Sequence, residues 1–297
     1  MDFGPALPAD LEREIFEFAA LSNLRSIVVL ALVAKRVRSW IEPLLYKNLS
    51  VFNDDDRFRR GDGADVIRIS TSDCLKVLES KSASFFHDHV RHLALTNILS
   101  DAGALILLRC TGVHRLAIFQ TPPDSSWLPM IATMGVLQIS MDINSLFGPS
   151  GVDFHHNIFA RLTHLDLFEL PTSKSWVADM CGLPCLTHLS FNFDSERRKN
   201  ISATACQLIL AECESLEALI LIFSNPIDRS EFGGCQYFSD DPRSVTIVVD
   251  DFLEDWERGA IGRGDYWIKA ERFIQKRRSG EIKGREYSIP VDWDPHS

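Results

Sequence analysis

Cysteine and histidine side chains at short spacings are the first candidates for metal or proton chemistry in this sequence. Cys181 and Cys185 lie four residues apart, a spacing that zinc can use, but no second matching pair completes a four-ligand site. His164 and His188, with Asp166 close by, could bind a metal ion or respond to pH if they lie on neighbouring strands. Histidines on a solvated surface are the simpler interpretation, so we predict no metal site and no cofactor.

The other groups of reactive side chains do not match a catalytic motif. Residues 87–92 and 153–156 are rich in histidine and aspartate, but neither has the helical or Cys-x-x-Cys-type spacing of a metal site. The glycines of residues 259–264 follow no predicted strand and precede no Lys-Ser or Lys-Thr pair, so they do not form a phosphate loop. Neither a Gly-x-Ser-x-Gly elbow nor a His-Glu-x-x-His motif occurs. We therefore predict no catalytic residues and a protein that is not an enzyme, with a hydrolase on a β-α scaffold as a remote alternative.

The composition argues against some classes of binding partner. The 297 residues carry a formal net charge of −10, which argues against binding to nucleic acid or to an anionic membrane, since both attract clustered Lys and Arg. The longest apolar run, residues 27–34, is far shorter than the roughly 20 residues of a membrane helix. The acidic N-terminus does not resemble a secretory signal, and the seven cysteines are spread through apolar contexts. We expect buried free thiols in a cytoplasmic or nuclear protein.

The first 46 residues have the periodicity of three short helices. Leu11 and Ile15 begin an apolar face at helical spacing. Residues 27–34 are apolar almost all round and are expected to form a buried helix, and residues 35–46 carry Trp40 on their apolar side. Helices this short have little core of their own, so a partner protein or the rest of the chain must cover them. Three ordinary helices packed on a larger domain remain the alternative.

An ordered set of apolar residues runs through this helical segment. It consists of Leu7-Pro8-x-x-Leu11-x-x-x-Ile15-Phe16, then Leu30-x-x-Val33-x-x-x-Val37-x-x-Trp40, and finally Pro43-Leu44-Leu45-Tyr46. The order resembles an F-box, in particular that of the large fungal set of F-box-like proteins. The resemblance implies a three-helix hook that binds the Skp-family adaptor of cullin-RING ubiquitin ligases. It also implies that the core and adaptor contacts of the hook are Leu7, Pro8, Leu11, Ile15, Phe16, Val33, Val37 and Trp40.

The rest of the chain repeats the pattern apolar-x-x-apolar-x-apolar. Its middle residues lie 23, 23, 26, 24 and 30 residues apart, and they are Leu93, Leu116, Ile139, Leu165, Leu189 and Leu219. Helix-like apolar stretches separate these strand-like patterns, so each unit is expected to be a strand followed by a helix. The period resembles that of leucine-rich repeats, which stack into a curved solenoid. A β-α domain with this spacing by chance is the alternative.

We therefore predict an α/β protein with two parts. Residues 1–48 form an F-box-like helical unit, and residues 49–297 form a leucine-rich-repeat-like solenoid whose end is covered by a helical cap at about residues 250–280.

The concave face of such a solenoid would be lined by the residues that alternate with the buried ones along each strand. We predict that it binds a protein substrate through Arg115, Phe119, Gln138, His164, Asp166, Phe168, His188, Asn192, Ile220 and Ile222. Ala218, Ile220 and Ile222 are apolar, so either they anchor a partner or the C-terminal segment folds over them.

Together the two resemblances imply a substrate-receptor subunit of a cullin-RING ubiquitin ligase. Its partners would be the Skp-family adaptor, through it a cullin, and a protein substrate, and it would be a monomer outside this complex. An interaction scaffold without a ligase is the second hypothesis.

Overall fold

The structure is a computed structural model that describes residues 7–55, 66–120, 122–193, 201–231, 240–283 and 285–294. The chain divides into two compact units, Met1–Val113 and His114–Ser297. Residues 1–6 of the predicted helical unit and Cys235 lie outside the described residues. Within the described residues, every helix is too short or too polar to cross a bilayer.

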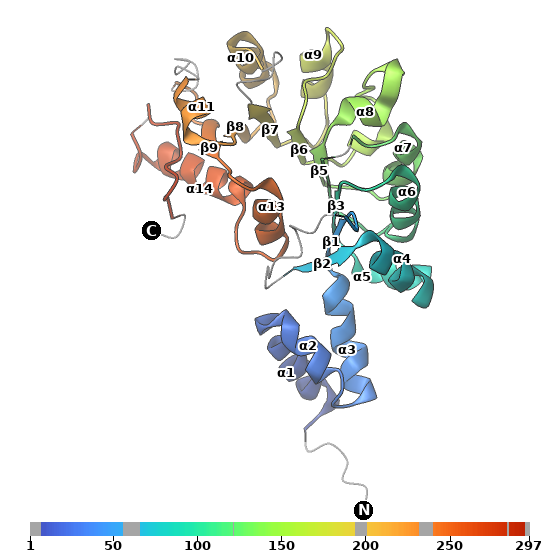
Figure 1. Ribbon diagram of the computed structural model, residues 1–297. Helices are drawn as coiled ribbons and strands as arrows, with labels where there is room; N and C mark the ends of the chain where they lie inside the picture. Colours follow the sequence, from blue (N-terminus) through green and yellow to red (C-terminus); the bar gives the residue numbers. More distant parts are fainter. Residues whose placement is uncertain are drawn as a thin grey trace, which may run out of the picture. The chain divides into compact units, whose positions relative to one another are not determined.

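The first unit combines the N-terminal helices with a small parallel sheet (Figure 1). Its elements are α1 (Ala9–Ser22), α2 (Ile27–Leu30), α3 (Lys35–Tyr46), β1 (Asn48–Phe52), β2 (Ile67–Ser70), α4 (Thr71–Ser80), α5 (Ala83–His89), β3 (His92–Thr96) and α6 (Ser100–Arg109). Strand β1 lies between β2 and β3 and pairs with both in parallel. The hydroxyls of Ser70 and Ser82 accept hydrogen bonds from Asp73 N and Phe85 N, so both serines cap the helices that follow them.

Six parallel strands form the centre of the described part of the second unit. Its first elements are β4 (Arg115–Phe119), α7 (Leu128–Ala132), β5 (Gln138–Met141), α8 (Ile143–Phe147), β6 (His164–Leu167), α9 (Trp176–Cys181) and β7 (His188–Phe193). They are followed by α10 (Ala203–Glu212), β8 (Ala218–Phe223), α11 (Pro226–Glu231), β9 (Ser244–Val248), α13 (Phe252–Ala260) and α14 (Tyr266–Ser279). The strands lie side by side in chain order from β4 to β9.

The repeated pattern sets the register of this sheet. Leu116 pairs with Ile139, Ile139 with Leu165, Leu165 with Leu189, and Leu189 with Leu219. All five side chains are buried, since they lie on the face that is covered by the helices between the strands. Parallel pairing requires such a crossover helix between neighbouring strands, which explains the period of 23 to 30 residues.

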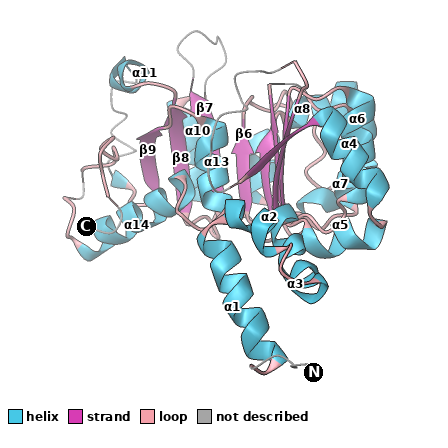
Figure 2. Cartoon of the chain, turned by 60° about the horizontal axis from the view of Figure 1, so that its bottom comes forward, coloured by secondary structure: helices cyan, strands magenta, loops and turns pink. Residues whose placement is uncertain are grey.

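Helices cover both faces of the six-stranded sheet (Figures 1 and 2). Helices α7 to α10 lie on one side, and α13 and α14 lie on the other. Helix α14 buries Trp267, Phe273 and Ile274 in the same apolar cluster as Ile220 and Ile222 of β8. Helix α13 reaches the strands through Phe252, whose ring centroid lies 6.5 Å from that of Phe168.

The prediction of an F-box-like unit followed by a leucine-rich-repeat-like solenoid with a helical cap at its end is wrong. The described residues form nine strands, three in the first unit and six in the second, and all of them belong to a parallel sheet of an α/β fold. Residues 250–280 do form helices, but these helices pack on a face of the sheet. A solenoid would leave this face open for a partner, whereas here the chain fills it with its own apolar side chains, as α/β folds do.

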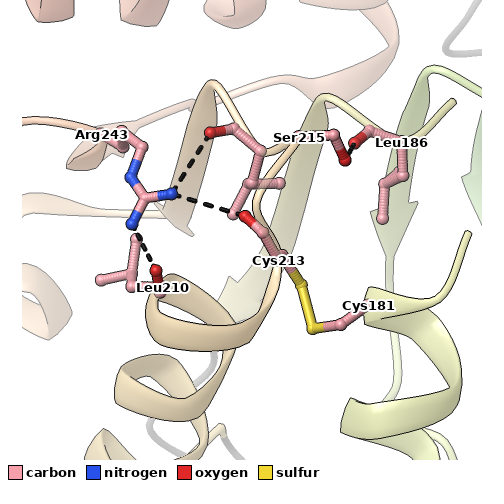
Figure 3. The surroundings of a disulfide bond; sticks show 7 residues. Cys181, Leu186, Leu210, Cys213, Ser215 and Arg243 are labelled. Carbon is pink, nitrogen blue, oxygen red and sulfur yellow. Dashed lines mark hydrogen bonds between the residues drawn. A yellow bond between two sulfur atoms is a disulfide. The ribbon is translucent and has the colours of Figure 1, made fainter. Parts of the chain in front are cut away.

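A disulfide joins two neighbouring helices of the second unit (Figure 3). Cys181 is the last residue of α9, and Cys213 caps the end of α10. Arg243 donates hydrogen bonds to the carbonyl oxygens of Leu210 and Cys213, so it holds the end of α10 beside this bond. The expectation of buried thiols outside any disulfide is therefore wrong for this pair, while Cys74, Cys110 and Cys206 are buried thiols outside this disulfide and Cys185 is an exposed one.

Candidate functional site

The N-terminal helices expose many large apolar side chains. Ile15 and Phe18 of α1 are 55% and 75% exposed, and Leu32 in the turn after α2 is 83% exposed. We call the whole set the N-terminal apolar surface, and its members are Leu7, Leu11, Ile15, Phe18, Leu21, Val28, Val29, Leu32 and Val33. Exposed apolar side chains that gather in one short segment are typical of a surface that binds another protein.

The small core between these helices explains the exposure. Ala20, Ile27, Val37 and Ile41 are completely buried against one another. A core of four residues occupies only one side of each helix, so the remaining apolar positions face solvent. The prediction that residues 27–34 are buried is wrong, because only Ile27 of the described α2 helix is buried.

The predicted adaptor contacts fall into two groups. Leu7, Pro8, Leu11, Ile15 and Val33 are exposed, so they are open to a partner. Phe16 and Trp40 are half-buried against the small core, and Val37 is part of it. The predicted adaptor contacts do not include the exposed Phe18, Leu21 and Leu32, although Phe18 continues the helical spacing of Leu11 and Ile15.

The predicted substrate face is largely filled by the chain itself. Ile220 and Ile222 are covered by α14, and Arg115, Phe119, Asp166 and His188 are also buried. Gln138, His164, Phe168 and Asn192 keep part of their surface accessible. Of the two possibilities that the apolar strand residues left open, the structure shows the C-terminal segment folded over them.

A buried ion pair anchors the C-terminal helices to the first strand of this unit. Arg115 Nη2 donates to Asp265 Oδ2 at 2.6 Å, and both side chains are buried. The guanidinium also lies over the ring of Trp256, at 5.2 Å from its centroid. Gly259 passes so close that a Cβ there would lie 2.3 Å from Asp265 Oδ2. A glycine in α13 therefore allows the ion pair to form.

Two histidines on neighbouring strands stack face to face. His164 of β6 and His188 of β7 are Cα partners, and their rings lie 4.1 Å apart and 5° from parallel. Trp267 of α14 meets both rings edge-on, with centroids 5.1 and 5.9 Å away. Burial and the neighbouring imidazole of His188 lower the pKa of His164 to about 3, so His164 is neutral.

Glu271 of α14 completes the group. One ligand atom from each of His164, His188 and Glu271 can be chosen so that all three lie within 4.8 Å of one another. His188 Nε2 is 3.1 Å from Glu271 Oε1, yet Nε2 has no partner in hydrogen-bond geometry among the described residues. His164 and Glu271 line a cavity of about 370 Å³ together with Gln138. We expected no metal ligands from the sequence, whereas these three side chains could share one ion.

Only part of this group has a signal in the sequence. The tetrapeptide Leu-Thr-His-Leu occurs at residues 162–165 and again at 186–189, so the two histidines occupy the same position of successive units. Glu271 has no such signal, because it meets the histidines only through the packing of α14 on the sheet.

Asp166 lies beside the histidines at the centre of the covered face. It accepts hydrogen bonds from the Ser190 hydroxyl at 2.8 Å and the Asn192 amide at 3.2 Å. Burial raises the pKa of Asp166 to about 7, in spite of these hydrogen bonds. Near neutral pH, this carboxyl group is therefore partly protonated.

The other histidine clusters have local structural roles. His87 Nδ1 lies 2.9 Å from Thr111 Oγ1, and His156 Nδ1 accepts from Ile158 N at 3.3 Å at the start of a short helical turn. Within the described ranges, only the group of His164, His188 and Glu271 brings three potential ligands together. In a comparison with known proteins, no protein-family model matches the chain, and no curated protein is found as a relative.

Proposed function

We propose that this protein is the substrate-receptor subunit of a cullin-RING ubiquitin ligase, and that its N-terminal apolar surface binds the Skp-family adaptor. One observation supports this most: apolar side chains that match the adaptor-binding pattern in sequence are exposed, among them Leu11, Ile15 and Val33. Burying them against a partner would remove a large apolar area from water. With this function the protein would act in the cytoplasm or the nucleus.

A pattern of charge around the surface also favours a protein partner. Glu12 binds Arg36 through two hydrogen bonds, of 3.0 and 2.7 Å, that join α1 to α3. Glu14 lies among Leu7, Leu11 and Ile15 on the exposed side of α1. Charged residues beside exposed apolar ones are common where the polar rim of a protein interface begins. On the predicted substrate face, only the accessible residues could contact the substrate, namely Gln138, His164, Phe168 and Asn192.

The test is a binding measurement between the full chain and a purified Skp-family adaptor. The variant Ile15→Glu/Phe18→Glu changes two exposed residues of α1, so it should fold as the parent does. We expect its affinity to fall more than about 100-fold, because central apolar interface residues commonly contribute about 2 kcal/mol each.

The matched control is Leu105→Glu/Leu108→Glu. These two leucines lie on α6 of the same unit. Their exposed fractions, 53% and 55%, are similar to the 55% of Ile15. This control should bind like the parent. A folded parent that does not bind the adaptor would refute the ligase function, and a control that also loses binding would refute the assignment to the N-terminal apolar surface.

A further inference from the structure

We propose that His164, His188 and Glu271 form a binding site for a divalent transition-metal ion of the zinc class. Imidazole nitrogens and one carboxylate oxygen are a common ligand set for Zn²⁺, and a tetrahedral ion bound in this way keeps one position for water or another ligand. The site is independent of the proposed adaptor binding, because its residues all belong to the second unit.

The hydrogen bonds of two threonines determine which ring nitrogens are available. Thr163 Oγ1 donates its single proton to Leu137 O at 3.0 Å, and it also lies 2.9 Å from His164 Nδ1. Since the hydroxyl proton is already used, Nδ1 must be the donor in the second bond. The neutral ring then carries its proton on Nδ1, and its Nε2 has a free lone pair.

The same arrangement recurs one strand further on. Thr187 Oγ1 donates to Thr163 O at 3.2 Å and lies 2.8 Å from His188 Nδ1. His188 therefore also holds a proton on Nδ1. Metal-binding histidines usually donate the proton of their second nitrogen to a fixed acceptor, which orients the ring, and the two threonines provide this acceptor.

Two acceptor atoms lie close together in the site. His188 is only 5% exposed, and its Nε2 lies 3.1 Å from a carboxylate oxygen of Glu271 without hydrogen-bond geometry toward it. With the proton of His188 on Nδ1, both atoms carry lone pairs, and a cation bound by both atoms would remove their repulsion. Ligands about 2.0 to 2.2 Å from a tetrahedral ion lie roughly 3.3 to 3.5 Å apart, so the observed distance is close to that of two ligands of one ion.

A metal ion fits this position better than a shared proton. A proton on His188 Nε2 would form a hydrogen bond to the carboxylate, but Nε2 lacks hydrogen-bond geometry among the described residues. The nearest strand cation, Arg115, is already paired with Asp265 at 2.6 Å, so its charge is compensated. The half-exposed Glu271 can rotate to bring its oxygen closer to His164. A bound ion would tie α14 to β6 and β7.

The site is tested by metal titration of the purified, chelator-treated full chain. Zn²⁺ affinity is measured by competition with a chromophoric chelator, and Co²⁺ is used as a visible probe of tetrahedral coordination. The test variants are Glu271→Gln, which keeps the shape of a residue on the surface of α14, and His188→Gln. The matched control is His155→Gln, because His155 is an exposed histidine of the same unit.

We expect the parent to bind one equivalent of Zn²⁺ and to give a Co²⁺ spectrum of tetrahedral type. Each test variant should lose affinity by a factor of at least about 10, since even residues that only support a metal ligand contribute 10- to 100-fold. The control should match the parent. Parent protein that binds no Zn²⁺, or a Glu271→Gln variant that is folded by circular dichroism and keeps the parent affinity, would overturn the site.

Discussion

The replacement Asp265→Ala should remove two interactions of one buried carboxylate. Oδ2 accepts from Arg115 at 2.6 Å, and Oδ1 accepts from Ile268 N at 3.1 Å, which caps the start of α14. Loss of the cap costs about 1 kcal/mol. An uncompensated buried guanidinium costs about 3 to 5 kcal/mol more. We therefore expect the free energy of unfolding to fall by about 4 to 6 kcal/mol, a large part of the total for a domain of this size.

A second cap in the same unit separates the two contributions. Asp251 caps α13 by accepting from Glu254 N at 3.0 Å, but it is exposed and has no such buried partner. The control Asp251→Ala should therefore cost only about 1 kcal/mol. The replacement Asp265→Asn keeps an oxygen for the cap and removes the charge, so it should cost nearly as much as the loss of the ion pair alone.

Urea denaturation followed by tryptophan fluorescence measures these differences, since Trp256 and Trp267 lie on the two helices concerned. In the double variant Arg115→Met/Asp265→Asn the buried charge is gone on both sides. Its loss in free energy of unfolding should be smaller than the sum of the two single losses, by about 2 kcal/mol or more. The reasoning is refuted if Asp265→Ala costs no more than Asp251→Ala, or if the single effects simply add in the double variant.

Three further predictions concern the same unit. Gly259→Ala should destabilise it by about 1 to 3 kcal/mol through overpacking, because the new Cβ would approach Asp265 Oδ2 to 2.3 Å; equal melting temperatures for variant and parent would contradict the close packing. Cys213→Ser should lower the free energy of unfolding by about 3 to 4 kcal/mol, since the bond to Cys181 closes a loop of 32 residues. Reductant should destabilise the parent and leave this variant unchanged, and an equal effect on both would exclude the disulfide as the cause. Asp166→Asn should remove one pH-dependent contribution to the free energy of unfolding. Because the pKa of Asp166 is raised from 3.8 to about 7 in the folded state, its protonated form stabilises the fold at low pH, and this contribution falls as pH rises from 4 to 7 by up to about 4 kcal/mol. Urea denaturation of the parent and of Asp166→Asn at pH 5 and pH 8, in the presence of chelator, separates this contribution from that of His164, whose lowered pKa changes stability in the opposite direction. A parent that lost no more stability than the variant between these two pH values would contradict the raised pKa of Asp166.

The positions of the strands could be predicted from the sequence because they depend on local pattern. Residues such as Leu165 and Leu189 repeat at the spacing of a strand plus a crossover, and the structure pairs them in register. The same pattern does not distinguish an open solenoid from a sheet covered on both faces. Both arrangements need a buried leucine at these positions, and they differ only in what covers the opposite face.

The residues of that opposite face show why the sequence did not distinguish an open solenoid from a covered sheet. His164 and Gln138 are polar, which favours an open surface, whereas Ile220 and Ile222 are apolar, which favours a covered one. The cover comes from Trp267 and its neighbours, far along the chain, and no local spacing links them to the strands. When one chain has two apolar faces without a partner, here on a strand and on a helix, we expect them to pack on each other. Each face left in water would lower the stability of the fold.

Two of the three ligands of the candidate metal site were visible in the sequence for the same reason. The two Thr-His pairs are an intrinsic part of the repeat, so parallel pairing alone brings His164 and His188 together. Glu271 reaches them only because the apolar face of α14 must cover β8 and β9, which fixes the helix at a register where its half-exposed edge carries the carboxylate to His188. Substitutions such as Phe273→Ala, which loosen this packing without touching a ligand, should therefore weaken metal binding as well as stability. If the metal site depended on the strands alone, such substitutions would leave its metal affinity unchanged.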